Sequence, residues 1–231
     1  MRKARGLDQR RRPDWTLQVI NSLDADVVAL QEADKRLGAR HPAIPRKMIE
    51  AETDYQLVEV SHNEISLGWH CNAILVRKGI KVIDVQRIDL TGLEPRGAVR
   101  LDLAGGLSVV ATHLGLRRRD RIVQLDAISA ATANCPRTVI AGDFNEWSAQ
   151  GGLEPLAERF AIHSPGRTFH ARRPVAGLDR FALSQGLHLH DARRAGRACT
   201  AGIGSSSDLG QRRRLPCGRL IAEQHGKFRV A

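Results

Sequence analysis

The feature that most limits how this chain can fold is a pair of apolar runs joined by a glycine-rich turn. The runs cover residues 98–103 and 107–112, and they flank Ala104-Gly105-Gly106. Glycine adopts the positive φ angles that tight hairpin turns require, so two apolar runs joined in this way are typical of a β-hairpin. The sequence therefore predicts an antiparallel hairpin near the middle of the chain.

Helix and strand patterns alternate on both sides of this hairpin. Apolar residues at helical spacing predict helices near 13–23, 46–52, 119–133 and 153–160. Short apolar runs predict strands at 26–30, 55–60, 72–76, 81–85, 138–141 and 178–183, with Lys78-Gly79 as a hairpin-like break between the third and the fourth. Helices and strands in this order indicate an α/β chain with much antiparallel pairing.

The composition is that of a folded and strongly basic protein. Of its 231 residues 42% are hydrophobic, so the chain can bury a sizeable core and global disorder is excluded. The formal net charge of +11 favours polyanionic partners such as nucleic acid, anionic lipid or phosphorylated small molecules. Aromatic residues make up only 4%, which argues against a protein that binds single strands by stacking bases.

The cysteines give no sign of a zinc site or a disulfide framework. No two of them form a Cys-x-x-Cys pair, so reduced thiols are expected; they are Cys71, Cys135, Cys199 and Cys217. The sequence also contains no secretory signal and no apolar run long enough to span a membrane. We therefore expect a cytoplasmic protein, and we expect it to be monomeric.

The chain divides into a patterned part and a tail. Residues 1–192 contain no linker and are expected to form one domain. From Arg193 onward Arg, Ser and Gly are frequent and no period of 2 or 3.6 is clear, so residues 193–231 are expected to form an irregular basic tail. The abrupt change of composition also fits a frameshift in the encoding DNA.

A polar pair follows the apolar run that ends at Ala141. Asp143 and Asn145 lie two positions apart, so both side chains are expected to point the same way while Phe144 turns toward the core. A carboxylate can deprotonate water or hold a metal, and an amide can donate to a developing negative oxygen. The pair suits phosphoester hydrolysis, although Asp and Asn are also ordinary turn residues.

Five further polar residues stand at the ends or starts of predicted strands. Glu32 closes an apolar strand, where a carboxylate can bind Mg²⁺, and His113 closes another, where it can protonate a leaving oxygen or neutralise phosphate charge. Asp179 opens a late strand and can orient a histidine. Asn72 and Arg96, also at strand starts, can contact phosphate. Each has an ordinary alternative as a solvated or hydrogen-bonded loop residue.

The order of the motifs is more specific than any one of them. They are Leu30-Gln31-Glu32, Gly68 with Asn72-Ala73-Ile74-Leu75, Thr112-His113-Leu114, Gly142-Asp143-Phe144-Asn145 and Leu178-Asp179-Arg180. Over roughly residues 7–190 the chain thereby resembles the endonuclease/exonuclease/phosphatase superfamily. The resemblance implies a four-layered α/β sandwich of two packed mixed β-sheets flanked by helices. It also implies in-line attack of water on a phosphoester, with Mg²⁺ as Lewis acid.

The resemblance assigns catalytic roles to four of these residues. Asp143 resembles the residue that orients or deprotonates the attacking water, and Asn145 resembles the amide that steadies the phosphorus. His113 resembles a histidine that assists at the phosphate. Asp179 resembles the carboxylate that pairs with a second, C-terminal histidine.

The resemblance also implies a metal site with Mg²⁺, or with Mn²⁺ in its place. Glu32 looks like the metal ligand, and Asp208 like a second, metal-linked carboxylate. Two departures bear on this site: the chain begins where the family's first strand should already have ended, and Ser207-Asp208 precedes Leu209 instead of histidine. We therefore expect a fold that lacks its first and last strands, in a chain that is truncated and frame-shifted or in a weakened enzyme.

Two functions stay open at this point. The first is a Mg²⁺-dependent phosphoester hydrolase, which is a nuclease, a phosphodiesterase or a phosphatase and is impaired in this form. The second is a non-catalytic basic module that keeps the fold and binds polyanions. The expected substrate is a phosphoester, and the net charge mildly favours nucleic acid.

Overall fold

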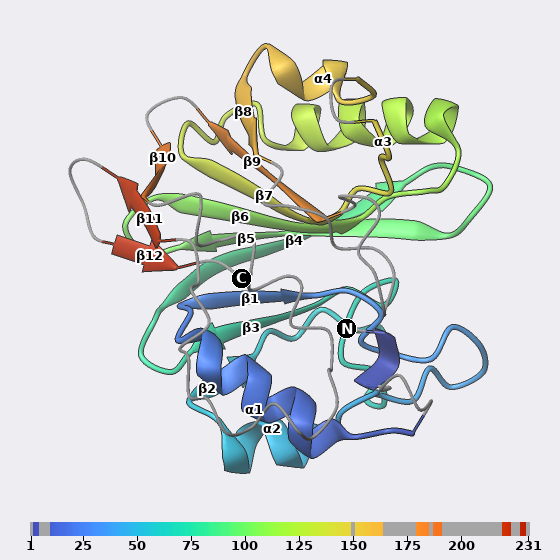
Figure 1. The fold of residues 1–231 in the computed structure, drawn as a ribbon, viewed down its shortest axis with the longest axis vertical. Coiled ribbons are helices and arrows are strands. Elements are labelled where there is room, and N and C mark those ends of the chain that lie inside the picture. The colour runs from blue at the N-terminus through green and yellow to red at the C-terminus, as the bar shows by residue number, and fades with distance from the viewer. Residues whose placement is uncertain are drawn as a thin grey trace.

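Two β-sheets packed face to face form the centre of the molecule (Figure 1). The computed structural model describes residues 2–4, 10–148, 151–163, 179–184, 187–190, 219–222 and 227–229. Helices cover the outer face of each sheet, so the described chain is a four-layered α/β sandwich. This fold class is the one that the sequence predicts.

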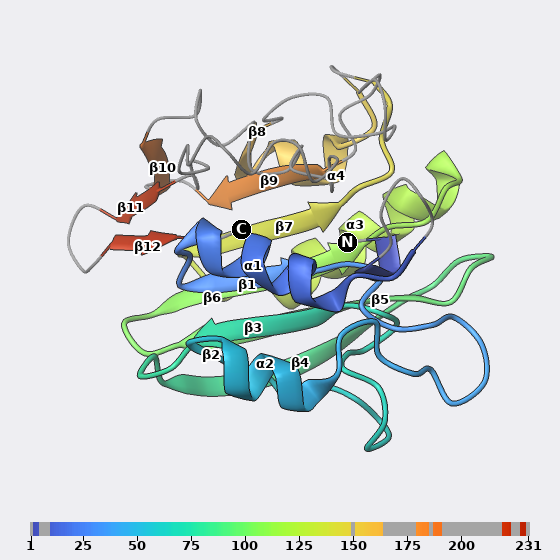
Figure 2. The same ribbon diagram turned by 60° about the horizontal axis from the view of Figure 1, so that its bottom comes forward.

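The smaller sheet has three strands in the order β1-β3-β2. They are β1 (Val27–Leu30), β2 (Tyr55–Leu57) and β3 (Ala73–Arg77), and both pairings are antiparallel. The outer face carries α1 (Pro13–Leu23) and α2 (Arg46–Glu52), which Figure 2 shows in front of the sheet. A 3-10 turn, η1 (Arg2–Ala4), contributes the buried Ala4 to the same layer.

The larger sheet has six strands in the order β4-β5-β6-β7-β9-β8. They are β4 (Val82–Leu90), β5 (Arg96–Leu103), β6 (Leu107–His113), β7 (Thr138–Asp143), β8 (Phe160–His163) and β9 (Asp179–Ser184). Every pairing is antiparallel except β6 with β7, which α3 (Arg118–Ala131) connects as a crossover. The short helix α4 (Glu154–Ala157) lies beside α3 on the outer face (Figure 1).

Apolar side chains fill the spaces between the layers. The cluster between the sheets includes Val27, Ile74 and Val76 from the small sheet and Val99, Leu101, Val109 and Val139 from the large sheet. A second cluster joins α1 and α2 to the small sheet, and a third joins α3 and α4 to the large one. Because strands of both sheets have apolar residues on both faces, their sequences are continuous apolar runs rather than strict alternations.

The central hairpin is confirmed, whereas the hairpin-like break at Lys78-Gly79 is wrong. β5 and β6 pair antiparallel around Gly105 and Gly106, which both have positive φ. β3 and β4, however, belong to different sheets, and Gly79 with φ 93° lies on the connection between them. β3 lies between β1 and β2, while β4 pairs with β5, so the turn carries the chain across the sandwich.

Two other segments differ from the sequence-based expectation. The helix expected near 153–160 covers only Glu154–Ala157, because Phe160 already belongs to β8, which pairs with β9. The irregular tail expected from residue 193 includes two short strands, β11 (Arg219–Ala222) and β12 (Lys227–Arg229), which form a third sheet with β10 (Leu187–His190). Strands of four and three residues are too short for a period to be recognised in the sequence.

Several expectations are untested by this architecture. The division at residue 192, the frameshift and the loss of a first and a last strand stay predictions. Within the described ranges, no helix combines the length and the apolar character needed to cross a bilayer.

Candidate active site

Strand register brings three of the predicted residues into one row. In the parallel pair β6–β7, His113 is opposite Asp143, and in the antiparallel pair β7–β9, Asp143 is opposite Asp179. The three backbone positions therefore lie side by side at one edge of the large sheet. The side chain of Asp179 lies outside the described residues, so its predicted role stays a prediction.

Gly142 allows the close contact between β6 and β7 at this edge. Its φ is 147°, and a Cβ at this position would lie 1.9 Å from the backbone oxygen of Thr112. A real Cβ never comes that close to a carbonyl oxygen, so no other residue fits here without moving a strand. Glycine is therefore needed immediately before Asp143.

His113 and Asp143 touch through their side chains. His113 Nε2 lies 3.6 Å from Asp143 Oδ2, and the two side chains are 7% and 24% exposed. Burial, together with the positive charges of Arg96 and Arg36, lowers the pKa of His113 to about 3, so the imidazole is neutral at neutral pH. Burial raises the pKa of Asp143, although the hydrogen bond from the Asn145 backbone opposes this shift.

The turn after β7 fixes the Asp143 carboxylate. Asn145 has a left-handed backbone with φ 50°, and its N–H donates to Asp143 Oδ1 at 2.9 Å. Its side-chain Nδ2 donates to the backbone oxygen of Leu114 at 2.8 Å, which ties this turn to the loop after β6. Phe144 is fully buried in the outer core, as the sequence predicts.

Two buried side chains of α3 hold the same two loops from behind. Arg121 donates to Glu146 Oε2 at 2.7 Å and to the Leu116 oxygen at 2.6 Å, and the side chains of Arg121 and Glu146 are only 6% and 7% exposed. Gln124 accepts from the Gly115 N–H at 2.8 Å. This network joins the segment that follows His113 to the segment that follows Asn145.

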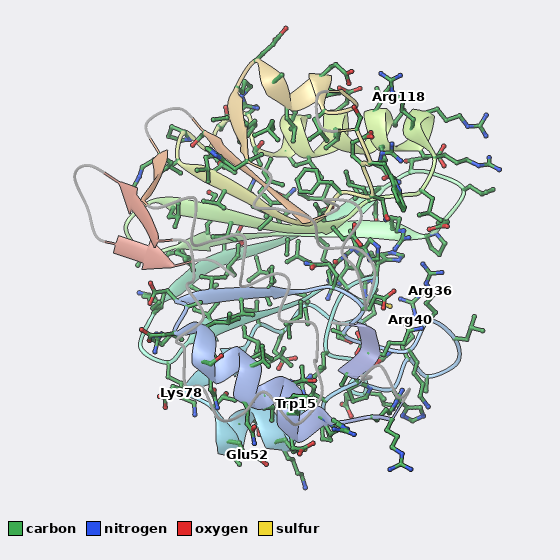
Figure 3. All side chains as sticks on the ribbon, in the orientation of Figure 1. Trp15, Arg36, Arg40, Glu52, Lys78 and Arg118 are labelled. Atoms are coloured by element: carbon green, nitrogen blue, oxygen red, sulfur yellow. The ribbon has the colours of Figure 1, made fainter. Side chains whose placement is uncertain are left out.

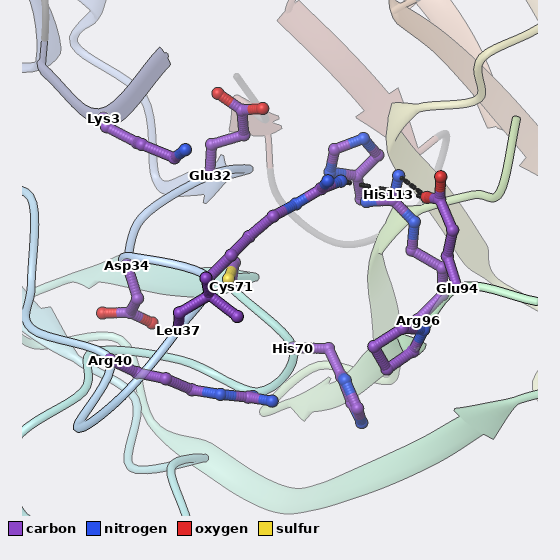
Figure 4. Close-up of a pocket in the computed structure, with 12 residues that line it drawn as sticks. Lys3, Glu32, Asp34, Leu37, Arg40, His70, Cys71, Glu94, Arg96 and His113 are labelled. Atoms are coloured by element: carbon purple, nitrogen blue, oxygen red, sulfur yellow. Dashed lines mark hydrogen bonds and ion pairs between the residues drawn. The ribbon is translucent and has the colours of Figure 1, made fainter.

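A cavity of about 240 Å³ lies next to this cluster, between the large sheet and the loop that follows β1. Figure 4 shows its lining; the residues are Lys3, Glu32, Asp34, Arg36, Leu37, Arg40, His70, Cys71, Glu94, Pro95, Arg96 and His113. We call residues Glu94, Pro95, Arg96 and His113 the sheet wall, and residues 32–40 the loop wall. Figure 3 places Arg36 and Arg40 on the same side of the molecule as Arg118, at the start of α3.

The sheet wall is held by ion pairs and hydrogen bonds. Arg96, whose side chain is 6% exposed, donates from Nη2 to Glu94 Oε2, and the Arg36 guanidinium approaches the same Glu94 oxygen at 3.8 Å. Arg96 Nε is buried and has no hydrogen-bond partner among the described residues. Arginine in this setting is suited to an oxyanion such as phosphate.

Glu32, the predicted metal ligand, lies on the loop wall. It follows β1 with a left-handed backbone of φ 54°, lines the cavity, and has no hydrogen bond or ion pair within the described ranges. Mg²⁺ often takes one or two carboxylates and completes its shell with water and substrate phosphate. The described residues contain no cluster of three or more His, Cys, Asp or Glu side chains able to hold a metal, and Asp208 lies outside them.

Asn72 is buried away from the cavity lining. Its Nδ2 donates to the Gly97 oxygen at 2.8 Å, which links the start of β3 to β5 in the other sheet. Its Oδ1 is buried without a hydrogen-bond partner in the described part of the chain. A direct contact between Asn72 and substrate stays a prediction, as does the contact proposed for Arg96.

Sequence reasoning missed the supporting residues of the site. Arg121 belongs to the run Arg117–Arg121 with one Asp inside it, which is typical of a solvated helix face, and Arg36 and Arg40 lie in a loop without periodicity. Gln124 is the one supporting residue that the sequence could have indicated, because it is a polar residue on the same helical face as the apolar Leu125 and Ile128.

Solved structures with the same arrangement of sheets and helices place the fold in a known class. An endonuclease/exonuclease/phosphatase from Beutenbergia cavernae is 18% identical over 82% of this chain and 63% of that chain, with a TM-score of 0.61. A mannosyl-6-phosphatase from Bacteroides thetaiotaomicron is 14% identical over 77% and 78%, with a TM-score of 0.59. The human Nocturnin catalytic domain with bound sulfate is 16% identical over 80% of each chain, with a TM-score of 0.55.

The family follows from the sequence itself. Residues 5–207 match the Endonuclease/Exonuclease/phosphatase family, and the chain belongs to this family. Its members are phosphoesterase and nuclease hydrolases. A comparison with curated protein sequences finds no match.

Proposed function

We propose that this protein hydrolyses a phosphoester by in-line attack of an activated water molecule, with Mg²⁺ as cofactor. The observation that carries the proposal is the contact of 3.6 Å between Asp143 and a histidine that lines a basic cavity. Membership of a family of phosphoesterases supports the same reaction. A mannosyl-6-phosphatase among the similar structures supports a phosphate ester as the kind of substrate.

Asp143 is the proposed base in this reaction. Its carboxylate takes a proton from the attacking water, whose oxygen forms a bond to phosphorus. The bond from phosphorus to the leaving oxygen breaks, the leaving oxygen keeps the electron pair, and solvent supplies its proton. Because burial raises the pKa of Asp143, its carboxylate is a stronger base than that of an exposed aspartate.

His113 is proposed to act as a neutral hydrogen-bond donor. With a pKa of about 3 it carries almost no imidazolium at neutral pH, so it is poorly suited to protonate a leaving oxygen. A neutral N–H group directed at a phosphoryl oxygen can instead stabilise negative charge as it develops. Arg96 adds a fixed positive charge beside it.

Glu32 is the proposed ligand of the metal. When bound, Mg²⁺ supplies Lewis-acid stabilisation of phosphoryl and leaving oxygens. Asp208 stays a proposed second ligand. Asn145 holds the Asp143 carboxylate through its backbone N–H, and its amide is also proposed to face the phosphorus.

Hydrolysis of bis(para-nitrophenyl) phosphate and para-nitrophenyl phosphate, with and without Mg²⁺, tests the proposal. Asp143→Asn is expected to lower kcat by about 10²–10⁴-fold because it removes the base. Glu32→Gln is expected to raise the Mg²⁺ concentration needed for half-maximal rate. Glu52→Gln, on the exposed end of α2, is the matched control and should leave both quantities unchanged. Hydrolysis that survives both Asp143→Asn and Glu32→Gln would refute the site.

A further inference from the structure

The cavity carries cations on two opposite walls, which do different things in the free protein. On the sheet wall, Arg96 pairs with Glu94, and Arg36 reaches from the loop wall toward the same carboxylate. On the loop wall, the half-buried Arg40 has no hydrogen bond or ion pair within the described ranges. Figure 4 shows Arg40 extending from the side of Asp34 toward His70.

Asp34, the buried acid at this end of the cavity, is already hydrogen-bonded, and the charge of Arg40 opposes the rise that burial causes in its pKa. Asp34 is fully buried, and its two oxygens accept the backbone N–H groups of Leu67 and Gly68 at 2.8 and 3.1 Å. Arg40 acts on this end of the cavity, since its charge helps to lower the pKa of His70. At the other end, burial together with Arg96 and Arg36 lowers the pKa of His113. The histidine at each end of the cavity is therefore affected by arginine charge.

The backbone at Arg40 is also in an unfavourable conformation. Its φ of 52° lies in the left-handed region, which side chains other than Gly, Asn and Asp seldom adopt. A partly desolvated guanidinium that no hydrogen bond from the described residues satisfies is costly as well, and an oxyanion with two oxygens matches its fork of donors. Both features are expected at a position that is completed by an anionic ligand.

We propose that Arg40 binds a second phosphate group of the substrate, so that the enzyme prefers small bisphosphorylated molecules to monophosphates. This proposal rests on the proposed function, in which His113 donates to the first phosphate and Arg96 adds positive charge beside it. The size of the cavity favours a small molecule. Its volume of about 240 Å³ is below the roughly 300–1,000 Å³ that holds drug-sized ligands. The cavity therefore suits a ligand of the size of a sugar phosphate, in preference to a segment of nucleic acid.

Direct binding tests the subsite without requiring turnover. Isothermal titration in metal-free buffer compares fructose 1,6-bisphosphate with fructose 6-phosphate and fructose 1-phosphate. The bisphosphate is expected to bind at least about tenfold more tightly than either monophosphate, because a hydrogen-bonded ion pair typically contributes that much. Arg40→Ala should abolish the difference, and Arg40→Lys should keep part of it.

Control variants separate the subsite from general electrostatics. Arg118→Ala removes an exposed arginine at the start of α3, outside the cavity lining, and should preserve the preference for the bisphosphate. Equal affinity for bisphosphate and monophosphates in the unmodified protein would overturn the proposal. An equal loss of affinity for the bisphosphate in Arg40→Ala and Arg118→Ala would overturn the proposal too, since such a result would reveal only a diffuse basic surface. A DNA oligonucleotide that displaces the bisphosphate and itself depends on Arg40 would assign the subsite to nucleic acid instead.

Failure of the reaction and failure of the subsite give different results. A protein that prefers the bisphosphate but hydrolyses no phosphoester retains the subsite and loses the proposed reaction. A protein that hydrolyses para-nitrophenyl phosphate through Asp143, yet binds all three sugars equally, retains the reaction and loses the subsite.

Discussion

The sheet wall and the loop wall of the cavity differ in how firmly their side chains are held by neighbouring residues. Behind the sheet wall, His113 is fixed by strand register, and the segments that follow β6 and β7 are joined by Asn145, Arg121 and Glu146. On the loop wall, Glu32 and Arg40 have no hydrogen-bond or ion-pair partner within the described ranges, and both have left-handed backbones. The first wall is preorganised before any ligand arrives, whereas on the second wall Glu32 and Arg40 offer charges that no hydrogen bond or ion pair of the described residues engages.

This difference indicates a division of labour. Catalytic groups must be held within a fraction of an ångström of the productive geometry, and residues on strands with buried supports meet this need. Recognition groups can lie on loops, because they gain their partner on binding. Substitutions behind the sheet wall should therefore affect both stability and activity, while substitutions of Glu32 and Arg40 on the loop wall should affect binding with little cost to stability.

The largest expected effect comes from Gly142→Ala, which would break the preorganised side. A Cβ there would lie 1.9 Å from the Thr112 oxygen, and backbone strain and overpacking each cost about 1–3 kcal/mol. We therefore expect a loss of up to about 6 kcal/mol of unfolding free energy, measured by urea denaturation, with loss of activity. Gly105→Ala, also at positive φ but with no heavy atom within 4 Å, is the control and should lose only the strain contribution.

The second largest effect is expected at the buried ion pair. Arg121→Ala removes the cation of a buried ion pair and leaves the Glu146 charge buried, and breaking such a pair typically costs about 3–5 kcal/mol. The double variant Arg121→Met with Glu146→Leu should recover most of the stability, because neither charge is then left buried. It should still have a lowered kcat with little change in KM if the pair positions the two loops. Full recovery of kcat in the double variant would show that the pair is merely structural.

The sequence predicts the elements with local signals, and the family motifs of the sheet wall, much better than the residues that support this wall. α1 and α2 have the predicted bounds, and Phe144 is buried as its alternation with Asp143 and Asn145 predicts. These features depend on neighbours close in sequence, such as a proline near a helix start or a side chain two positions away. The family motifs add His113 and Asp143, which the strand register then brings together.

The missed features depend on contacts between distant residues. Arg121 and Glu146 are 25 positions apart, and only the packing of α3 over the turn after β7 makes them a buried pair. β3 and β4 follow each other across a short turn but belong to different sheets, because pairing is decided by strands elsewhere in the chain. Local patterns contain no information about either outcome.

A smaller effect is expected in the pH dependence of stability. The pKa of His113 is about 3 in the folded chain and near 6.5 when unfolded, so the unfolded state binds the extra proton between these values. Stability should therefore fall as the pH falls from 6.5 toward 3, by at most about 1.4 kcal/mol per pH unit from this residue. The raised pKa of Asp143 acts in the opposite direction just above pH 3.8, where the folded state binds the proton more readily.

Denaturation at a series of pH values measures this dependence. His113→Gln should flatten the slope between pH 6.5 and 3, whereas the same change at the exposed His41 should leave the slope in place. An unchanged slope in His113→Gln would mean that burial does not hold the imidazole neutral. The sheet wall would then be less desolvated than its packing indicates.

The smallest expected effect on stability is that of Arg40→Ala, and it tests the other half of the comparison. Arg40 has no ion pair or hydrogen bond in the described ranges, so its removal should change the unfolding free energy by no more than about 0.5 kcal/mol. Relief of a cation near the cavity can even make the change stabilising. A loss of about 2 kcal/mol or more is the size expected when a buried polar group loses its partner. Such a loss would mean that Arg40 supports the loop wall structurally. The contrast with Arg121→Ala, which removes an arginine that has an ion-pair partner, measures directly how far the two walls differ.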